Sequence, residues 1–288
     1  MTTPRVSIVL STRNRAGFLP EALRSHERIV TEVPWELVVV DNGSTDATPQ
    51  VLRDFARETR IVFRPVTESR PGLSCARNTG WRTAEGDLVA FTDDDCYPSP
   101  GFVDAIAACF ADANLDYLGG RITLHDPEDA PVTIQLRDTP LVIEPHSFVP
   151  AGFIQGANMA ARRRVLETLD GFDELLGAGT PYPSEDIDFV SRASAAGFNG
   201  AYDPRPAVAH HHRRRTAEQV ESLRRSYDVG RGAYYAKCLL DPLRRGLTWR
   251  VWARSLVRSA LPIHSSARAR AQSVGELRGA FGYLKDRR

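Results

Sequence analysis

Three consecutive aspartates, Asp93 to Asp95, end an apolar run in the stretch LVAFTDDDCYP. Carboxylates this close repel one another, and partial burial raises their pKa values further. Side chains of an extended segment alternate between its two sides, so Asp93 and Asp95 are expected to point together and Asp94 away. Two carboxylates at a strand end suit Mg²⁺ or Mn²⁺ bound to phosphate. The stretch predicts a metal site; the alternative is a solvated turn or the cap of a helix near Ser99.

The stretch PSEDIDF carries a second group of acids, Glu185, Asp186 and Asp188. A carboxylate beside a hydroxyl nucleophile can act as a general base, because it takes the proton as the hydroxyl attacks. The same residues also fit an ordinary helix start, with Ser184 as the cap and the acids at the positive end of the helix.

Candidate phosphate and metal ligands lie in SRPGLSCARNTG and PAVAHHHRRR. In the first stretch, Arg70, Arg77 and Asn78 lie on or beside a predicted helix start, and both helix N-termini and arginines favour anions. The alternative for Arg77 is an ion pair with the aspartates. Three adjacent histidines, at 210–212, are poorly spaced to share one ion, and the alternative is a surface run of histidines and arginines. The arginines at 213–215 either neutralise a diphosphate or lie in solvent.

The first hundred residues predict the scaffold that must position these groups. Strands are predicted over 5–11, 35–41, 61–66 and 87–93, with helices over 17–28, 45–59 and 72–86. Near-continuous apolar strands separated by amphipathic helices indicate a parallel sheet covered on both faces. Ligands bind beyond the carboxyl ends of such strands. The polar loops STRN, DNGSTD and TDDD fall there and are expected to converge on one site.

The rest of the chain divides into two parts. Residues 99–215 are predicted to extend the same sheet, with a helix over 101–113 and strands over 117–124, 153–161 and 207–210. Residues 216–288 are predicted to form a helical, basic extension. Within it, LTWRVWARSLVRSAL places Leu247, Trp249, Trp252 and Leu256 near one face and arginines on another. Such a helix either lies on an anionic membrane surface or packs on the protein with its arginines in solvent.

Composition narrows the class of protein. The 288 residues are 42% hydrophobic and 25% charged, which is ordinary for a globular protein. A net charge of +1 gives no argument for nucleic acid as a partner. The four cysteines are far apart and lack a C-x-x-C pair, which favours reduced thiols in a cytoplasm. No apolar run is long enough to span a bilayer. The chain is therefore expected to be cytoplasmic, or peripheral at the inner face of the membrane, and its oligomeric state is left open.

In order and spacing, four stretches resemble the family 2 glycosyltransferases, whose fold is called GT-A. They are SIVLSTRNR, ELVVVDNGSTDAT, GLSCARNTGWRTAEGDLVAFTDDDCYP and SEDIDFVSRASAAGF, and the resemblance covers about residues 5–214. The D-x-D element alone is a weak signal, whereas four ordered elements are a strong one. The resemblance implies an α/β GT-A domain over 1–215, with a nucleotide-sugar-binding half at 1–98 and an acceptor and catalytic half at 99–215.

The resemblance also implies roles for individual residues on the donor side. Thr12, Arg13 and Asn14 correspond to the segment that holds the nucleotide base and ribose. Asp41 corresponds to the aspartate that hydrogen-bonds the base, although DNGSTD also suits a turn. The other residues implied near the nucleotide and its diphosphate are Arg70, Arg77, Asn78, Asp93 and Asp94.

On the acceptor side, the resemblance makes Asp186 the general base and Glu185 a residue that orients the acceptor. It implies that His210 joins Asp93 and Asp95 as a metal or diphosphate ligand. The segment of Gly156, Ala157 and Asn158 corresponds to the wall below the donor sugar, where small residues let a ligand approach the backbone.

Together these features predict a metal-dependent, inverting glycosyltransferase that uses Mn²⁺ or Mg²⁺. Its donor is a nucleotide-diphosphate sugar, with UDP expected first and dTDP or GDP as alternatives. Its acceptor is a hydroxyl of a glycan, a lipid-linked glycan or a natural product. The alternatives are a nucleotidyltransferase acting on sugar phosphates and a non-catalytic sugar-nucleotide-binding protein. A phosphatase is disfavoured, because Ser11 and Thr12 follow the first strand where that enzyme needs an aspartate.

Overall fold

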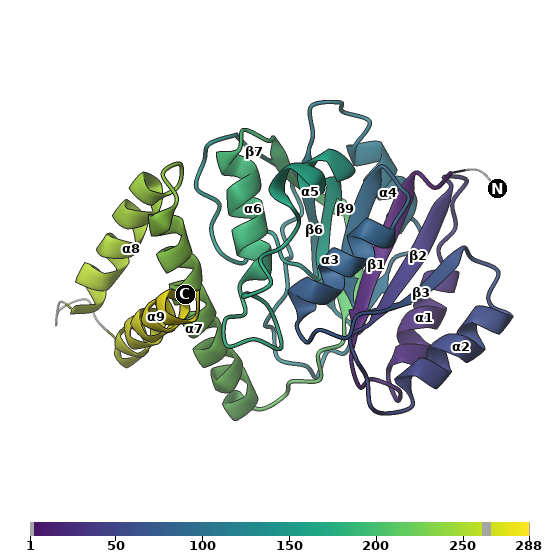
Figure 1. Cartoon of the computed structure of the whole chain (residues 1–288), viewed down its shortest axis with the longest axis horizontal. Coiled ribbons are helices and arrows are strands. Elements are labelled where there is room, and N and C mark those ends of the chain that lie inside the picture. The colour runs from purple at the N-terminus through teal and green to yellow at the C-terminus, as the bar shows by residue number, and fades with distance from the viewer. Residues whose placement is uncertain (1–2, 261–265, 288) are drawn as a thin grey trace.

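Parallel strands alternating with helices form the first part of the chain, as predicted (Figure 1). The computed structural model describes residues 3–260 and 266–287. The strands pair in the order β3 (Phe63–Thr67), β2 (Trp35–Asp41), β1 (Val6–Thr12) and β4 (Leu88–Asp93). The connecting helices are α1 (Leu19–Glu27), α2 (Thr48–Glu58) and α3 (Leu73–Thr83). Proline in the first turn of α1 and of α2 suits a helix start, because the missing N–H needs no partner there.

The second part of the chain extends the same sheet with mixed pairing. Within the described residues, nine strands form one sheet in the order β3-β2-β1-β4-β8-β6-β9-β5, with β7 also paired to β9. The added pairs are antiparallel except β6 with β9, so the parallel arrangement holds mainly for the first half. The elements added here are β5 (Cys96–Pro98), α4 (Phe102–Cys109), β6 (Tyr117–Leu124), β7 (Leu141–Ile143), β8 (Asn158–Arg162), α5 (Arg163–Leu169), α6 (Glu185–Ala195) and β9 (Gly200–His210).

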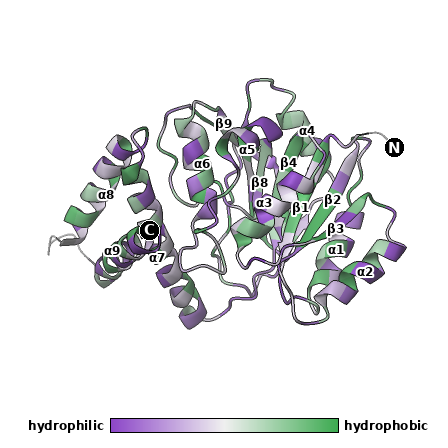
Figure 2. Ribbon diagram, viewed as in Figure 1, coloured by the Kyte–Doolittle hydropathy of each residue, from purple (hydrophilic) through white to green (hydrophobic). Residues whose placement is uncertain are grey.

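Each face of the sheet has its own apolar core, because successive residues of a strand point to opposite faces. In β4, Leu88 and Ala90 join the core beneath α1, α2 and α4. Val89 and Phe91 join the core beneath α3, α5 and α6. Figure 2 shows these strands as the hydrophobic centre of the molecule. The buried strands therefore hold the polar residues at their carboxyl ends in place.

The C-terminal extension is helical, as predicted, and packs on the rest of the chain. It consists of α7 (Ala217–Leu240), α8 (Arg245–Ala260) and α9 (Ala267–Asp286). A third apolar core joins these helices to Leu176 and Tyr182. Gly232 and Gly279 let α7 and α9 approach closely, since a Cβ at either would overlap the backbone of the other helix. Along the part of the chain that the structure describes, no helix is both long and apolar enough to cross a bilayer.

A buried charge cluster also ties the extension to α6. Asp188 accepts from Arg192 Nε at 2.8 Å, from Lys237 Nζ at 2.8 Å and from Arg244 Nη1 at 3.1 Å. Although burial opposes ionisation, these three cations hold the pKa of Asp188 well below its ordinary value. Lys237 lies on α7, and Arg244 lies in the turn before α8. Asp188, which the sequence predicted at a helix start, therefore links α6 to the C-terminal extension.

The amphipathic pattern predicted for residues 247–261 is wrong in detail. In α8, Trp252 is buried and Leu256 packs beside it. Leu247 and Trp249, expected on the same face, are 41% and 58% exposed. Leu261, like Arg288, lies outside the described residues. Helix α8 thus packs on the protein through one face and still exposes apolar residues on another.

Candidate functional site

A cavity of about 710 Å³ opens at the carboxyl ends of β1 and β4. Its walls come from segments far apart in the sequence: the starts of α3 and α6, the residues before β8, the end of β9, and α7. Two of the three polar loops predicted to converge, those after β1 and β4, contribute residues to the wall. The cavity combines a strongly acidic floor with arginines, as described below.

The three aspartates line the cavity together, but not by strand alternation. Strand β4 ends at Asp93, and Asp94 and Asp95 form a turn before β5, so the expected alternation does not apply. Each carboxylate has its own partners. Asp93 accepts from Arg77 Nη2 at 3.1 Å, and Asp94 accepts from Thr12 Oγ1 at 2.7 Å. Burial raises the pKa of Asp93, and it raises the pKa of Asp94 to about 6.

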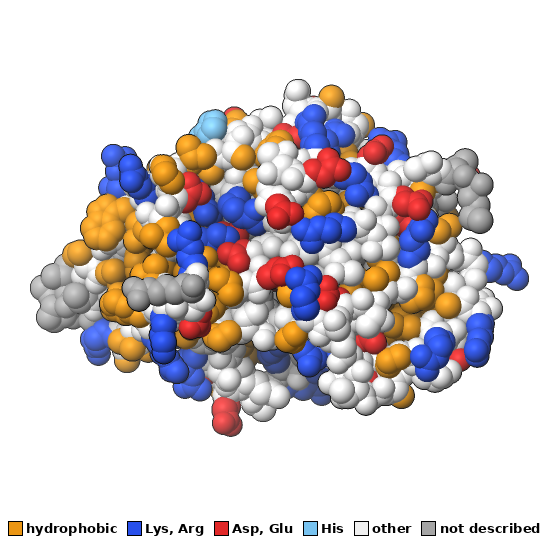
Figure 3. Space-filling model, viewed as in Figure 1, with side chains coloured by type: hydrophobic (Ala, Val, Ile, Leu, Met, Phe, Trp, Pro, Cys, Tyr) orange, Lys and Arg blue, Asp and Glu red, His pale blue; other side chains and the backbone are white. Residues whose placement is uncertain are grey.

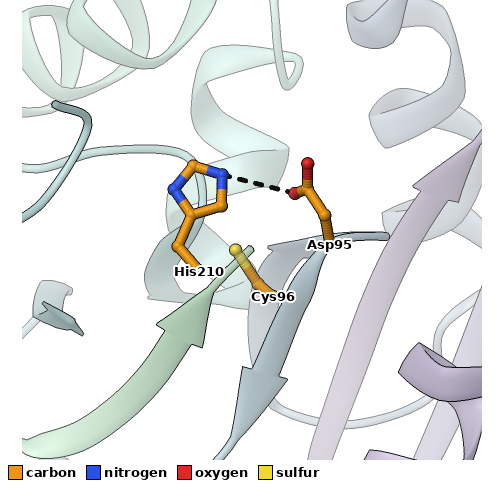
Figure 4. A group of neighbouring side chains, drawn as sticks. All are labelled: Asp95, Cys96 and His210. Atoms are coloured by element: carbon orange, nitrogen blue, oxygen red, sulfur yellow. Dashed lines mark ion pairs between the residues drawn. The ribbon is translucent and has the colours of Figure 1, made fainter. Parts of the chain in front are cut away.

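Asp95 is the aspartate that meets the histidine. Its Oδ1 lies 3.3 Å from His210 Nε2, as Figure 4 shows. The other ring nitrogen of His210, Nδ1, lies 3.2 Å from the carbonyl oxygen of Thr133, which suits an N–H donor and leaves Nε2 facing the carboxylate. The pairing lowers the pKa of Asp95 against the effect of burial, and it raises that of His210.

These residues fit a divalent metal. Ligand atoms of Asp95, Cys96 and His210 lie within 4.8 Å of one another. Burial keeps the pKa of the Cys96 thiol well above its ordinary value, so this thiol is a poor ligand. Carboxylate oxygen and imidazole nitrogen are donors that Mn²⁺ accepts, and Asp93 lines the same cavity. The donor set therefore suits a divalent cation at Asp95 and His210, while Asp93, which is not in this group, stays a predicted ligand.

The other two histidines of the run have different partners, although the ring of His212 lies 5.1 Å from that of His210. The ring of His211 lies beside that of His125, with centroids 4.8 Å apart. His212 is buried, and its Nδ1 accepts from the amide of Arg214 at 3.0 Å while Nε2 lies 3.0 Å from the carbonyl of Ala130. Both contacts of His212 are to backbone, which assigns it a structural role.

Arg77 is a buried bridge between the two acidic groups of the cavity. Its Nη1 donates to Glu185 Oε1 at 2.7 Å, and its Nη2 donates to Asp93 Oδ1 at 3.1 Å. Its guanidinium also lies over the ring of Phe172 at 5.6 Å. A Cβ at position 156 would lie 2.5 Å from Nη2. The missing side chain of Gly156 therefore makes room for Arg77. The structure therefore shows the ion pairs of Arg77, and because Arg77 also lines the cavity, its role near the donor stays a prediction.

Glu185 and Asp186 begin helix α6 at the wall of the cavity. Burial, and then the neighbouring charge of Asp186, raise the pKa of Glu185 to about 7, although Arg77 opposes this shift. Asp186 accepts from the backbone amides of Gly156 at 3.0 Å and Ile187 at 2.7 Å. Those two hydrogen bonds fix the orientation of its carboxylate toward the cavity.

The predicted nucleotide-binding residues lie at the ends of β1 and β2. Thr12 is directly opposite Asp41 in the paired strands. Among the described residues, the cavity wall includes Arg13 but not Thr12, Asn14 or Asp41. Asp41 Oδ1 accepts from the amide of Ser44 at 3.0 Å, and Asn14 Oδ1 accepts from the amide of Thr45 at 2.7 Å. These contacts confirm the turn in DNGSTD and place the predicted base-binding residues beside the cavity.

Three other predicted site residues do not reach the cavity wall that the described residues form. Asn78 is buried, and it donates to the carbonyl of Phe172 at 2.9 Å while accepting from the amide of that residue at 2.8 Å. Asn158 donates to the carbonyls of Arg121 at 2.8 Å and Pro206 at 3.0 Å. Arg70 is at the surface, paired with Glu68 and Glu174. Their hydrogen-bond and ion-pair partners are protein groups, and their roles at the donor or acceptor stay predictions. Gly156 and Ala157 do line the cavity.

Several wall residues were missed from the sequence. Arg15 donates to Asp94 at 3.0 Å and to Asp95 at 3.2 Å, so it neutralises part of the acidic floor. Its position, just past the STRN loop, was a usable signal. Tyr227 and Arg231, which were also missed, line the cavity, as does Arg214 of the arginine run considered for the diphosphate. Tyr227 lies on α7 and is 41% exposed. No local pattern marks an α7 residue as part of a site built on strands.

Comparison with known proteins identifies relatives by sequence. The family model described as glycosyl transferase family 2 matches residues 7–170. The pre-mycofactocin glycosyltransferase of Mycobacterium tuberculosis is 29% identical over 220 residues, which are 72% of this chain and 43% of that protein. Glycosyltransferase AglE of Haloferax volcanii is 24% identical over 254 residues, which are 87% of this chain and 80% of that protein. The chain spans less than half the length of the mycobacterial relative.

Solved structures share the fold. The mannosyltransferase PcManGT from Pyrobaculum calidifontis, in complex with GDP-Man and Mn²⁺, aligns with a TM-score of 0.63 at 19% identity, covering 100% of this chain and 89% of that one. A TarS fragment of S. aureus in complex with UDP-GlcNAc aligns with a TM-score of 0.65 at 19% identity, covering 95% and 79%. The α/β fold expected from the sequence is confirmed.

Proposed function

Because the chain belongs to glycosyl transferase family 2, we propose that it is a metal-dependent, inverting glycosyltransferase. It moves a sugar from a nucleotide-diphosphate sugar to an acceptor hydroxyl. The observation that carries the proposal is one cavity with an acidic, histidine-backed floor at Asp93, Asp95 and His210 and a separately oriented carboxylate, Asp186, in its wall. Transfer of an activated sugar needs both parts, one for the diphosphate and one for the acceptor.

The donor nucleotide binds at the ends of β1 and β2. Thr12 and Asp41 face one another there, with Arg13 and Asn14 beside them. UDP is the nucleotide we expect first, with dTDP and GDP as alternatives. Support comes from the arrangement of the sheet, since ligands of such sheets bind beyond the carboxyl ends of the strands. The side chains of Asp41 and Asn14 already accept hydrogen bonds from amides of the DNGSTD turn. The base therefore binds against the outer side of these strand ends.

Asp93, Asp95 and His210 hold the Mn²⁺ or Mg²⁺ ion. When bound, the ion supplies Lewis-acid stabilisation of the charge that develops on the leaving diphosphate. Arg15 forms an ion pair with Asp95, and Arg214 lines the same cavity. A guanidinium can donate two hydrogen bonds to a phosphate group at once. These two arginines therefore add positive charge where the diphosphate leaves.

Asp186 removes the proton from the acceptor hydroxyl as that oxygen attacks the anomeric carbon. Attack from the side opposite the leaving diphosphate inverts the anomeric configuration. The two backbone hydrogen bonds to Asp186 hold its carboxylate ready without occupying its whole accepting capacity. Glu185, held by Arg77, keeps the start of α6 in place and orients the acceptor beside it.

The acceptor enters between Gly156 and Ala157 on one side and α7 on the other. Tyr227 of α7 offers an aromatic ring, which is a suitable surface for a sugar or a natural-product scaffold. A lipid-linked glycan fits the same opening. We place the site of action in the cytoplasm, at or near the membrane, on the strength of four unpaired buried cysteines and the basic C-terminal helices.

A thermal-shift panel tests the donor half of the proposal. UDP, dTDP and GDP are each added with and without Mn²⁺, and the correct nucleotide at a hundred times its Kd stabilises the fold by about 2.7 kcal/mol. Asp95→Ala should abolish the Mn²⁺-dependent part of the shift and keep the fold. Asp126→Ala is the matched control, since Asp126 also lies near a histidine, His211, but outside the cavity wall. If no nucleotide diphosphate shifts the wild type with Mn²⁺, the proposal is wrong.

A further inference from the structure

The outer side of helix α8 mixes apolar and basic residues. Leu247, Arg250, Arg254, Val257 and Arg258 are all exposed. Their spacing of three or four residues places them on one side of the helix. The buried residues of α8, among them the one that joins the third core, lie on the other side. This side of α8 therefore remains unpartnered in the described chain while its opposite side is packed.

Helix α9 has a similar outer side. Val274, Leu277, Phe281 and Leu284 recur at intervals of three or four residues. Val274 is 66% exposed and Phe281 is 71% exposed. Figure 3 shows apolar side chains gathered over α8 and α9 with arginine and lysine side chains around them. We call the outer sides of the two helices, from Leu247 to Arg258 and from Val274 to Lys285, the α8–α9 face.

A groove between α8 and the start of α9 lies beside the α8 part of this face. The groove has a volume of about 520 Å³, and its wall includes Arg254, Arg258, Ser255 and Gln272. Arg254 and Arg258 are one helical turn apart and exposed. Two guanidinium groups beside a hydroxyl and an amide are suited to a phosphate group, which accepts hydrogen bonds through several oxygens.

The charge of the region selects the kind of partner. The acidic residues that the structure describes after Leu240 are Asp241, Glu276 and Asp286, and each already has a partner within the protein. The basic residues of the α8–α9 face therefore have no acidic counterpart on that face. A second copy of the chain docked there would bring arginine against arginine, which is unfavourable. An anionic surface that also accepts apolar side chains matches both properties.

We propose that the α8–α9 face docks on an anionic phospholipid bilayer, with Arg254 and Arg258 holding headgroup phosphates and Phe281 and Val274 entering the boundary with the acyl chains. This inference deepens the membrane-proximal site of action proposed above. It rests on that proposal for its biological role, whereas binding to a bilayer requires no glycosyl transfer. Amphipathic helical surfaces bind membranes through this combination of buried apolar area and attraction to anionic lipid.

Sedimentation with vesicles tests the inference. The full chain is mixed with vesicles of phosphatidylglycerol and phosphatidylcholine in equal parts, or of phosphatidylcholine alone. We expect binding to the anionic vesicles only. Each basic residue at an anionic surface contributes about fivefold to partitioning, so Arg254→Glu with Arg258→Glu should weaken binding by at least about twentyfold. Phe281→Ser should weaken it as well, because an apolar contact is lost.

A matched control separates this site from a general effect of charge. Arg53→Glu with Arg57→Glu makes the same change on exposed arginines one turn apart on α2, far from α8 in Figure 1. This variant should bind vesicles nearly as the wild type does. Circular dichroism verifies that both variants are folded. The inference is overturned if the wild type ignores anionic vesicles, if it binds phosphatidylcholine equally well, or if both double variants lose binding alike. It is also overturned if light scattering shows that the wild type dimerises and that Arg254→Glu with Arg258→Glu abolishes the dimer instead.

Discussion

Replacing Arg77 with methionine should destabilise the protein severely, although the change keeps much of the side-chain volume. Arg77 is 2% exposed and is the shared partner of Glu185 and Asp93. Without the guanidinium, the buried Glu185 and the partly exposed Asp93 lose a counter-charge. Removing one partner of a buried ion pair costs about 3–5 kcal/mol, because the remaining charge is left uncompensated. For a chain of this size, that loss lowers the Tm by roughly 6–10 °C.

The effect should depend on pH in a defined direction. The pKa of Glu185 is already raised to about 7, above that of the unfolded chain, so its folded state binds the proton more tightly. Such a group stabilises the folded state at low pH, and this stabilisation is lost as the pH rises through the pKa of the group in the folded state. Removal of Arg77 raises this pKa further. The difference in stability between wild type and variant should therefore widen above pH 7 and level off below it.

Urea unfolding at several pH values measures this difference, and Arg82→Met is the matched control. Arg82 lies on the same helix, pairs with Asp170 at 2.7 Å and lies over the ring of Trp81, but it is partly exposed. Its loss should cost roughly 1 kcal/mol or less. Adding Glu185→Gln to Arg77→Met should recover part of the stability, since one unpaired charge is removed. Equal losses for Arg77→Met and Arg82→Met would refute the reasoning.

Three further predictions concern catalysis, packing and acid stability. Asp186→Asn should bind a nucleotide diphosphate with Mn²⁺ as the wild type does, while turnover in a sugar-transfer assay falls about 10²–10⁴-fold; unchanged transfer would place the base elsewhere. Gly156→Ala should lower the Tm, because its Cβ would lie 2.5 Å from Arg77 Nη2 and small-to-large changes in packed sites cost about 1–3 kcal/mol. Gly101→Ala, which meets nothing within 4 Å, is its control, and equal shifts would contradict the packing argument. Burial lowers the pKa of His26 to about 4, so its contribution to stability is complete above pH about 6.5 and is lost as pH falls toward 4, by up to about 3 kcal/mol. Urea midpoints at pH 7 and pH 5 measure this loss, and His26→Gln should remove that part of the pH dependence; an unchanged slope would contradict it.

The chain's local patterns were sufficient for the elements of the first half. Apolar runs of six or seven residues form β1, β2 and β4, and β2 and β4 end at the aspartates Asp41 and Asp93. Position at a strand end was also enough to place the aspartates and His210 in one site. The orientation of Asp94 and Asp95 was not predictable in this way, because a turn rather than a strand holds them. Alternation of side chains applies only while the backbone is extended.

The sequence by itself determined which residue types lie at the ends of the buried strands. Short-range hydrophobic patterns mark the buried strands, and the polar loops follow them in a fixed order along the chain. Only the tertiary structure decided which partner each polar group takes. Arg77 pairs with Glu185, 108 positions away, while Asn78 turns to Phe172 and leaves the cavity wall. Tyr227 also lines the cavity, but it lies on α7, and the strand pattern of the sequence does not predict that this helix contributes to the site. Such pairings depend on contacts between distant segments, and a local sequence pattern carries no information about the distance between them.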